Sequence, residues 1–183
     1  MLPYLKRQFQ LADPEAATYA MVPLLAGAFS QWFAGWMVDA VYRSRYRAWS
    51  RKIPAVIGFA LSCAGLLALT RANSPGAAAA YFTFAVFGSD MTVGPSWVFC
   101  ADIAGTKVGS VSGAMNMVGN VGSFVSANAF PVLLTATGTS AAYFLVAAAL
   151  NVLALCCWLG MRSLNEPEPG PAMVQEIRLG ESG

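Results

Sequence analysis

Long apolar stretches separated by short polar or charged segments dominate the chain. Each stretch is long enough to cross about 30 Å of hydrocarbon at about 1.5 Å of helix per residue. Five such stretches cover residues 16–42, 53–70, 77–101, 108–134 and 141–161. We therefore predict an all-α integral membrane protein with about five transmembrane helices.

The segments between these stretches carry signals for turns and helix ends. Asp13, Pro14 and Glu15 suit the first turn of a helix, because acids and proline are favoured there. Gly94 and Pro95 predict a kink inside the third span, since proline removes a backbone donor. Residues 163–183 combine three prolines with four glutamates, so we expect a disordered tail there.

Composition excludes several functions. The chain is 57% hydrophobic and 11% charged, with a mean hydropathy of +0.55, and its net charge of +2 is too small to indicate nucleic-acid binding. It contains no histidine, and its four cysteines lack ligand spacing, so neither a metal site nor a cofactor is expected. An enzyme is therefore the least favoured class.

Basic residues set the predicted orientation. Eight of the eleven fall on one side of the predicted spans, five of them between Arg43 and Lys52. Cytoplasmic loops carry an excess of Lys and Arg. We expect a multi-pass protein with that loop and the C-terminus in the cytoplasm.

Asp90 is the one carboxylate placed deep in a predicted span. Such a group is costly at the bilayer midplane unless it is paired, hydrated or protonated. Two interpretations are open: a site that couples transport to a proton or cation, and a neutral structural acid bonded to a neighbouring helix. Its helix face also carries Thr83, Phe87, Gly94 and Trp97, a mixture that suits the wall of a polar cavity.

A polar stripe on the fourth span is the second candidate. Ser112, Asn116, Asn120 and Ser123 recur at three- and four-residue spacing on one helix face. The asparagines suit either a polar ligand or hydrogen bonds to neighbouring helices, and the same alternatives hold for Gln31 in the first span. The glycines of the fourth span predict close helix packing; they are Gly105, Gly109, Gly113, Gly119 and Gly122.

Two patterns resemble the major facilitator superfamily. Gly35, Asp39 and Arg43 match its Gly-x-x-x-Asp loop motif, although Ala40 and Tyr42 replace the basic residue and the glycine that usually follow. The run from Trp97 to Asp102 and the residues after it are similar to helices ten and eleven of the anion:cation symporter branch; those residues are Gly109, Gly113, Asn116, Gly119, Asn120, Gly122 and Pro131.

The resemblance implies a fold and a function. The five spans correspond to helices 8–12 of a 12-helix fold, and residues 1–15 to the end of the preceding helix and an extracytoplasmic loop. We expect a secondary active transporter of organic anions such as sugar acids, coupled to protons or sodium by alternating access in a bacterial inner or plasma membrane. This chain is then inactive without the N-terminal half; the alternative is a standalone five-helix scaffold or interaction protein in the lipid bilayer.

The same resemblance assigns roles to the candidate residues. Asp90 would couple ion and substrate movement, while substrate contacts would come from Asn116, Asn120, Ser96, Trp97 and Gln31. Gly35, Asp39 and Arg43 would form a conformational latch, the alternative being a solvated interfacial charge. Every arginine lies in a loop, a turn or the tail, so we expect the anion's basic partner in the missing half.

Overall fold

The computed structural model describes residues 1–46 and 49–161, and the regular elements within those ranges are helical. The predicted disordered tail, residues 163–183, lies outside the described residues. The elements follow the order α1 (Leu2–Phe9), α2 (Asp13–Tyr42), α3 (Lys52–Leu69), α4 (Pro75–Met91), α5 (Val93–Ala104), the 3₁₀ turn η2 (Gly105–Lys107), α6 (Val108–Thr137) and α7 (Ala141–Gly160).

Local sequence explains several of these boundaries. Asp13 and Glu15 lie in the first turn of α2, where acidic side chains offset the positive end of the helix dipole. Ser74 caps α4, because its hydroxyl accepts a hydrogen bond of 3.2 Å from the backbone N–H of Ala77. Pro75 follows at the first helical position, where its missing N–H costs no intrahelical bond.

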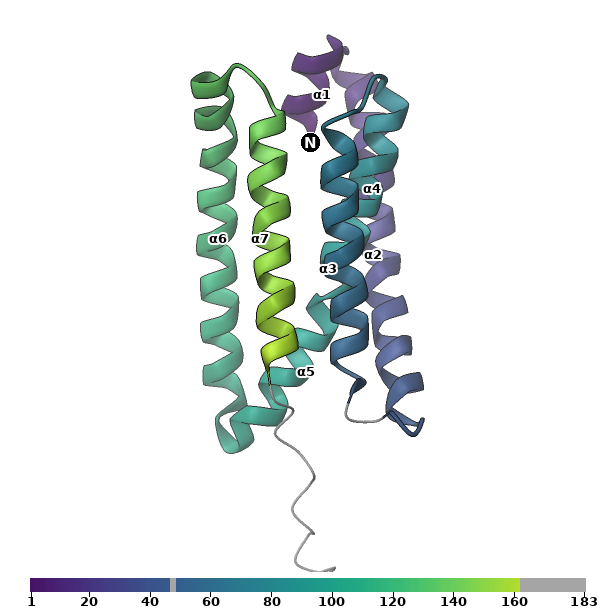
Figure 1. Ribbon diagram of the computed structural model, residues 1–183, viewed down its shortest axis with the longest axis vertical. Coiled ribbons are helices and arrows are strands. Elements are labelled where there is room, and N and C mark those ends of the chain that lie inside the picture. The colour runs from purple at the N-terminus through teal and green to yellow at the C-terminus, as the bar shows by residue number, and fades with distance from the viewer. Residues whose placement is uncertain (47–48, 162–183) are drawn as a thin grey trace, which may run out of the picture.

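Four helical stretches in the described ranges are long and apolar enough to cross a membrane: Asp13–Tyr42, Lys52–Leu69, Pro75–Thr137 and Ala141–Gly160. The third takes in α4, α5, η2 and α6, and the chain reverses direction at η2 (Figure 1). That stretch therefore passes along the bundle twice. The predicted all-α membrane fold with about five spans is confirmed.

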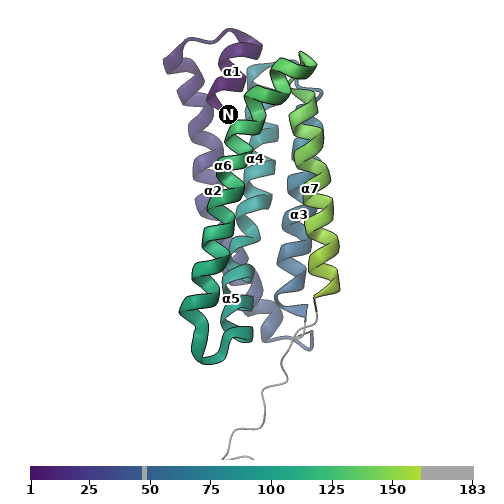
Figure 2. The same cartoon turned by 90° about the vertical axis from the view of Figure 1, so that its left-hand side faces the viewer.

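α4 is the central helix of the bundle. It packs along α2 on one side and α3 on another, and α3 in turn packs against α7. α5 leaves the lower end of α4 and leads through η2 to α6, which returns along the outside beside α7 (Figures 1 and 2). The loop that joins α2 to α3 lies at the same end as η2, and we call this the basic end of the bundle.

Small residues allow α3 and α4 to approach closely. A side chain added at Gly65 would place its Cβ 2.6 Å from the backbone nitrogen of Ala85, and one at Gly58 would lie 2.6 Å from the carbonyl oxygen of Gly88. Ser62 lies between them and shares a hydroxyl hydrogen bond of 2.9 Å with Ser89. In lipid, where the hydrophobic effect does not drive helices together, such contacts supply the packing energy.

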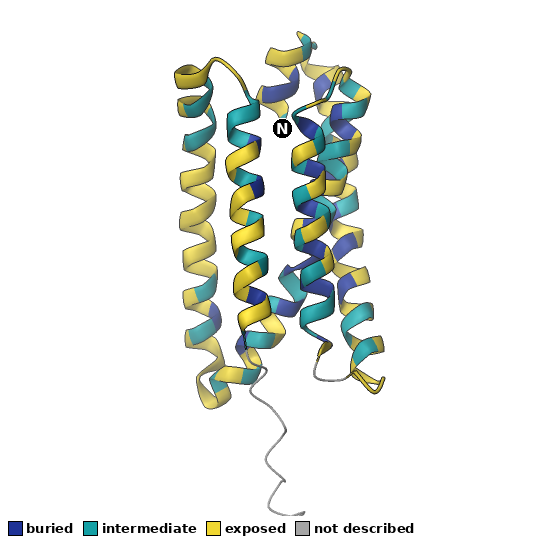
Figure 3. Ribbon diagram, viewed as in Figure 1, coloured by how far each residue is buried: buried dark blue, intermediate teal, exposed yellow. Residues whose placement is uncertain are grey.

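The predicted glycine packing of α6 is wrong. A Cβ built at Gly109, Gly113, Gly119 or Gly122 would meet no atom within 4 Å, and Ser112 is the buried residue of this helix. Gly105 ends α5 with a φ of 51° instead, a turn conformation that favours glycine. Figure 3 shows α6 exposed along most of its length. The spacing predicts a small-residue face, but the described residues supply no neighbour for that face.

Candidate functional site

Asp90 lies in the last turn of α4, at the interface with α2. Its side chain is partly buried, and its Cγ is 3.4 Å from the position of a Cβ at Gly27. Val86, one turn earlier on α4, borders the same position on α2. Within residues 1–46 and 49–161, no hydrogen bond or ion pair reaches the Asp90 carboxyl group.

Hydroxyl groups around Asp90 already have partners. Ser30 of α2 donates to the backbone carbonyl of Phe87 and ties α2 to α4. Thr92 donates to the carbonyl of Ser89 at 2.8 Å. These hydroxyl groups therefore donate to backbone carbonyls and not to the Asp90 carboxyl group.

The third span breaks directly after Asp90. α4 ends at Met91 and α5 begins at Val93, and the buried Pro95 has no N–H to donate to the carbonyl of Met91. The predicted kink is confirmed, with the break at Thr92. The C-terminal end of a helix carries partial negative charge, so Asp90 lies at a point that favours a cation.

Ser96 and Trp97 lie on α5 just beyond the break. The Ser96 hydroxyl donates to the carbonyl of Thr92 at 2.8 Å, while the Trp97 side chain is exposed. Gln31 is also exposed, on α2. Ser96 and Trp97 thus follow Asp90 closely in the sequence, just beyond the break between α4 and α5. No described contact joins these residues to one another.

Asn116 and Asn120 lie on the exposed surface of α6. The Asn120 amide donates to the backbone carbonyl of Asn116 at 2.9 Å, and Ser123 likewise donates to Gly119 at 3.0 Å. Within the described residues, neither asparagine side chain bonds to another helix or to Asp90. Their hydrogen-bonding capacity is directed outward, so a shared site with Asp90 stays a prediction.

Gly35, Asp39 and Arg43 lie at the exposed end of α2, near the basic end. The backbone N–H of Arg43 donates to the carbonyl of Asp39 at 3.0 Å, as expected at a helix C-terminus. A Cβ at Gly35 would meet nothing within 4 Å, and no ion pair to Asp39 is present in the described ranges. Their role as a latch stays a prediction.

A second set of contacts at the basic end was not predicted. Arg51, before α3, forms an ion pair with Asp102 of α5, and the two side chains are only 18% and 25% exposed. Lys52 donates to the carbonyl of Leu159 near the end of α7 at 3.2 Å, and it lies 5.6 Å from the ring centroid of Trp49. Opposite charges in two segments between predicted spans, at the same end of the bundle, are the sequence signal that points to the first pair.

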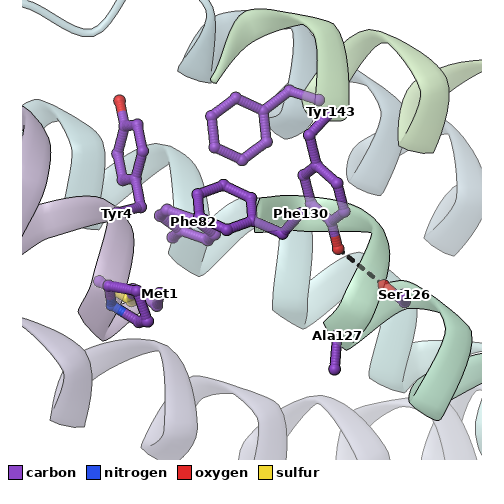
Figure 4. A pocket seen from close by; sticks show the side chains of 9 residues that line it. Met1, Tyr4, Phe82, Ser126, Ala127, Phe130 and Tyr143 are labelled. Carbon is purple, nitrogen blue, oxygen red and sulfur yellow. Dashed lines mark hydrogen bonds between the residues drawn. The ribbon is translucent and has the colours of Figure 1, made fainter. Parts of the chain in front are cut away.

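The other end of the bundle holds an aromatic cavity of about 300 Å³ between α1, α4, α6 and α7 (Figure 4). Ser126 and Tyr143 share a hydroxyl hydrogen bond of 2.7 Å at its edge. Its lining also includes Tyr4, Phe82, Phe130 and Phe144, and none of the predicted site residues. Edge-to-face ring contacts stabilise the packing here, such as Tyr4 against Phe144 at 5.1 Å between centroids.

A helical membrane bundle with a broken helix and a carboxylate at the break is typical of secondary transporters. The chain belongs to the Major Facilitator Superfamily, whose model matches residues 1–178. This membership agrees with the resemblance that the two sequence patterns indicate.

Two curated relatives are plant proteins. The chain is 29% identical over 157 residues to "Probable anion transporter 3, chloroplastic" of Arabidopsis thaliana, a match covering 85% of this chain and 31% of the relative. It is 32% identical over 124 residues to "Probable anion transporter 2, chloroplastic" of Oryza sativa subsp. japonica, covering 67% and 23%. The chain therefore spans less than a third of the length of these relatives.

Proposed function

We propose that the chain forms the C-terminal half of a secondary active transporter of organic anions such as sugar acids, in the anion:cation symporter branch. Its membership of the superfamily and two relatives named as anion transporters support this proposal. The single structural observation that carries it is Asp90, a partly buried carboxyl group at the break between α4 and α5. Such intramembrane acids mark ion pathways in pumps and transporters.

Asp90 would couple the anion to a proton or sodium ion, and Asn116, Asn120, Ser96, Trp97 and Gln31 would contact the anion. The outward-facing amides of α6 suit this role, because they need a partner from the facing half or from a ligand. The two halves would rock around a site near the midplane. Gly35, Asp39 and Arg43 would hold the cytoplasmic end in one of the two states.

The anion's basic partner would belong to the N-terminal half. The helix interiors of the described chain carry no arginine or lysine, and those residues lie at the ends of helices or between them. An organic anion in a membrane cavity needs a positive group, since an unpaired charge is costly there. This chain alone should therefore bind the anion weakly and should not transport it.

The test is uptake of a radiolabelled sugar acid into proteoliposomes that contain this chain joined to an N-terminal six-helix half of the family. We expect accumulation driven by a pH or sodium gradient, with none from this chain alone. Asp90→Asn should abolish the response to the gradient while exchange of anion across the membrane persists. Gradient-driven uptake that is unchanged in Asp90→Asn would remove Asp90 from the mechanism.

A further inference from the structure

We propose that Gly27 of α2 is a positioning residue for Asp90, and that the ion taken up at this position is a proton and not sodium. The inference rests on the proposed coupling role of Asp90. It adds a second residue, from another helix, and a choice between the two coupling ions.

The Asp90 carboxyl group fits against Gly27 because this residue has no side chain. A Cβ built at Gly27 would overlap Oδ2 of Asp90 and would lie 3.2 Å from Cγ1 of Val86. The Asp90 carboxyl group therefore fills the volume that any other residue at position 27 would need. Gly27 is itself buried in the α2 surface that faces α4, so the fit belongs to the interface between the two helices.

The hydroxyl groups near this carboxyl group along α2 and α4 bond to other partners. Ser30, the nearest hydroxyl on α2 along the chain, donates to the carbonyl of Phe87. Ser89 bonds to Ser62, and Thr92 bonds to the carbonyl of Ser89. Within the described ranges, the oxygen atom against Gly27 thus accepts no hydrogen bond and forms no ion pair.

Charged and titratable groups on the packed elements lie elsewhere. They are Tyr4, Lys6 and Arg7 of α1, Asp13, Glu15, Tyr19, Asp39 and Tyr42 of α2, Lys52 and Cys63 of α3, Tyr81 of α4, and Cys100 and Asp102 of α5. In the part of the chain that the structure describes, none of them bonds to Asp90. The described surroundings of its carboxyl group are therefore the surface of α2 at Gly27 and the last turn of α4.

These surroundings suit a proton. A hard metal cation in a protein takes several oxygen ligands, which usually include more than one carboxylate or carbonyl group. No group of three His, Cys, Asp or Glu residues in the described ranges could hold a metal ion. A proton needs one carboxylate oxygen, and the neutral acid that results can lie against the Gly27 backbone without a counter-charge.

The first experiment measures protonation at Asp90 directly, with this chain in lipid nanodiscs. Dicyclohexylcarbodiimide modifies a protonated carboxyl group in apolar surroundings, and peptide mass spectrometry locates the product. We expect Asp90 to be modified faster as pH falls, at an equal rate in sodium chloride and in choline chloride. Protection by sodium would overturn the choice of a proton, and absence of modification at every pH would overturn proton uptake at Asp90.

The second experiment changes Gly27, the residue against which the Asp90 carboxyl group lies. Gly27→Ala should displace the carboxyl group from α2, so that a water-soluble carbodiimide modifies Asp90 severalfold faster. Gly76→Ala is the matched control, because it lies on α4 with open space around its Cβ. An unchanged rate in Gly27→Ala would overturn the positioning role, whatever the outcome of the uptake assay, because modification requires neither substrate nor transport.

A thermal-unfolding cycle covers the case in which Gly27→Ala folds poorly. The variant should lower the midpoint of unfolding by several degrees, and most of that loss should disappear in Gly27→Ala/Asp90→Ala, where the overlapping carboxyl group is gone. An equal loss in both backgrounds would assign Gly27 to helix packing alone and overturn the proposal.

Discussion

At the scale of single residues, glycines allow helices of this chain to approach one another closely. Gly65 and Gly58 bring α3 onto α4, and Gly27 brings α2 onto α4. Gly58 and Gly65 meet the backbone of α4, whereas Gly27 makes room for the side chains of Asp90 and Val86. Close contact of this kind attracts helices to one another in lipid. The glycines of α6 have no such neighbour, so the same residue type has a different energetic role there.

Gly65→Ala should therefore destabilise the chain by about 1–3 kcal/mol, because its Cβ would overlap the α4 backbone. Gly113→Ala should be neutral or stabilising by up to about 1 kcal/mol, since alanine is the better helix former and the site is open. Unfolding of both variants in mixed micelles, followed by circular dichroism, checks the difference. Equal effects would contradict the observed α3–α4 contact.

At the scale of elements, the break between α4 and α5 is the feature that the sequence predicts best. Pro95 cannot donate to Met91, so a break near this point follows from covalent structure alone. Its location at Thr92, two residues after Asp90, coincides with the burial of Thr92 and Pro95. The sequence supplies the proline that interrupts the helix, and packing determines the residue at which the helix breaks.

Pro95→Ala should restore a donor to the carbonyl of Met91 and join α4 to α5. We expect slower amide hydrogen exchange across residues 90–96, measured by mass spectrometry. Pro75→Ala is the control, because that proline occupies a first-turn position where no intrahelical bond is missing. Unchanged exchange in Pro95→Ala would mean that tertiary contacts alone hold the break open.

The ion pair between Arg51 and Asp102 joins the segment before α3 to α5 at the basic end of the bundle. Both side chains are mostly buried, so their coupling should exceed that of an exposed pair, at about 1–2 kcal/mol. A double-mutant cycle of Arg51→Gln and Asp102→Asn measures it by chemical unfolding. The same cycle on Lys6 and Asp13, which are 45% and 79% exposed, should give about 0–0.5 kcal/mol. Similar coupling energies in the two cycles would contradict the role of burial.

At the scale of the whole molecule, α6 is a long helix with little of its surface covered. Its exposed apolar residues suit lipid, but Asn116 and Asn120 do not. The chain spans less than a third of the length of its curated relatives, and a facing N-terminal half would supply the missing cover. Under the proposed function, the polar stripe of α6 would line the pathway between the two halves.

Cysteine labelling tests this placement in a protein that contains both halves. Asn116→Cys and Asn120→Cys should react with a water-soluble maleimide, and bound anion should slow the reaction. Val118→Cys is the control: the residue is exposed, but it lies on the opposite side of α6 and should face lipid. Equal labelling at all three positions would place the asparagines outside an aqueous pathway.

The sequence by itself determined the class of protein, the helical spans and the break in the third span. These properties follow from local hydrophobic length and from proline chemistry, which are readable one segment at a time. It also identified Asp90, because a carboxylate inside an apolar stretch is conspicuous wherever the stretch is packed.

Only the tertiary structure decided which residues meet. Gly27 touches Asp90 from a helix more than sixty residues away in the chain, and Arg51 before α3 meets Asp102 of α5. Glycine spacing predicts close packing on α6, yet it is the glycines of α3 that meet a neighbouring helix. Spacing along one helix defines a face, but the partner of that face depends on how the helices are arranged in space.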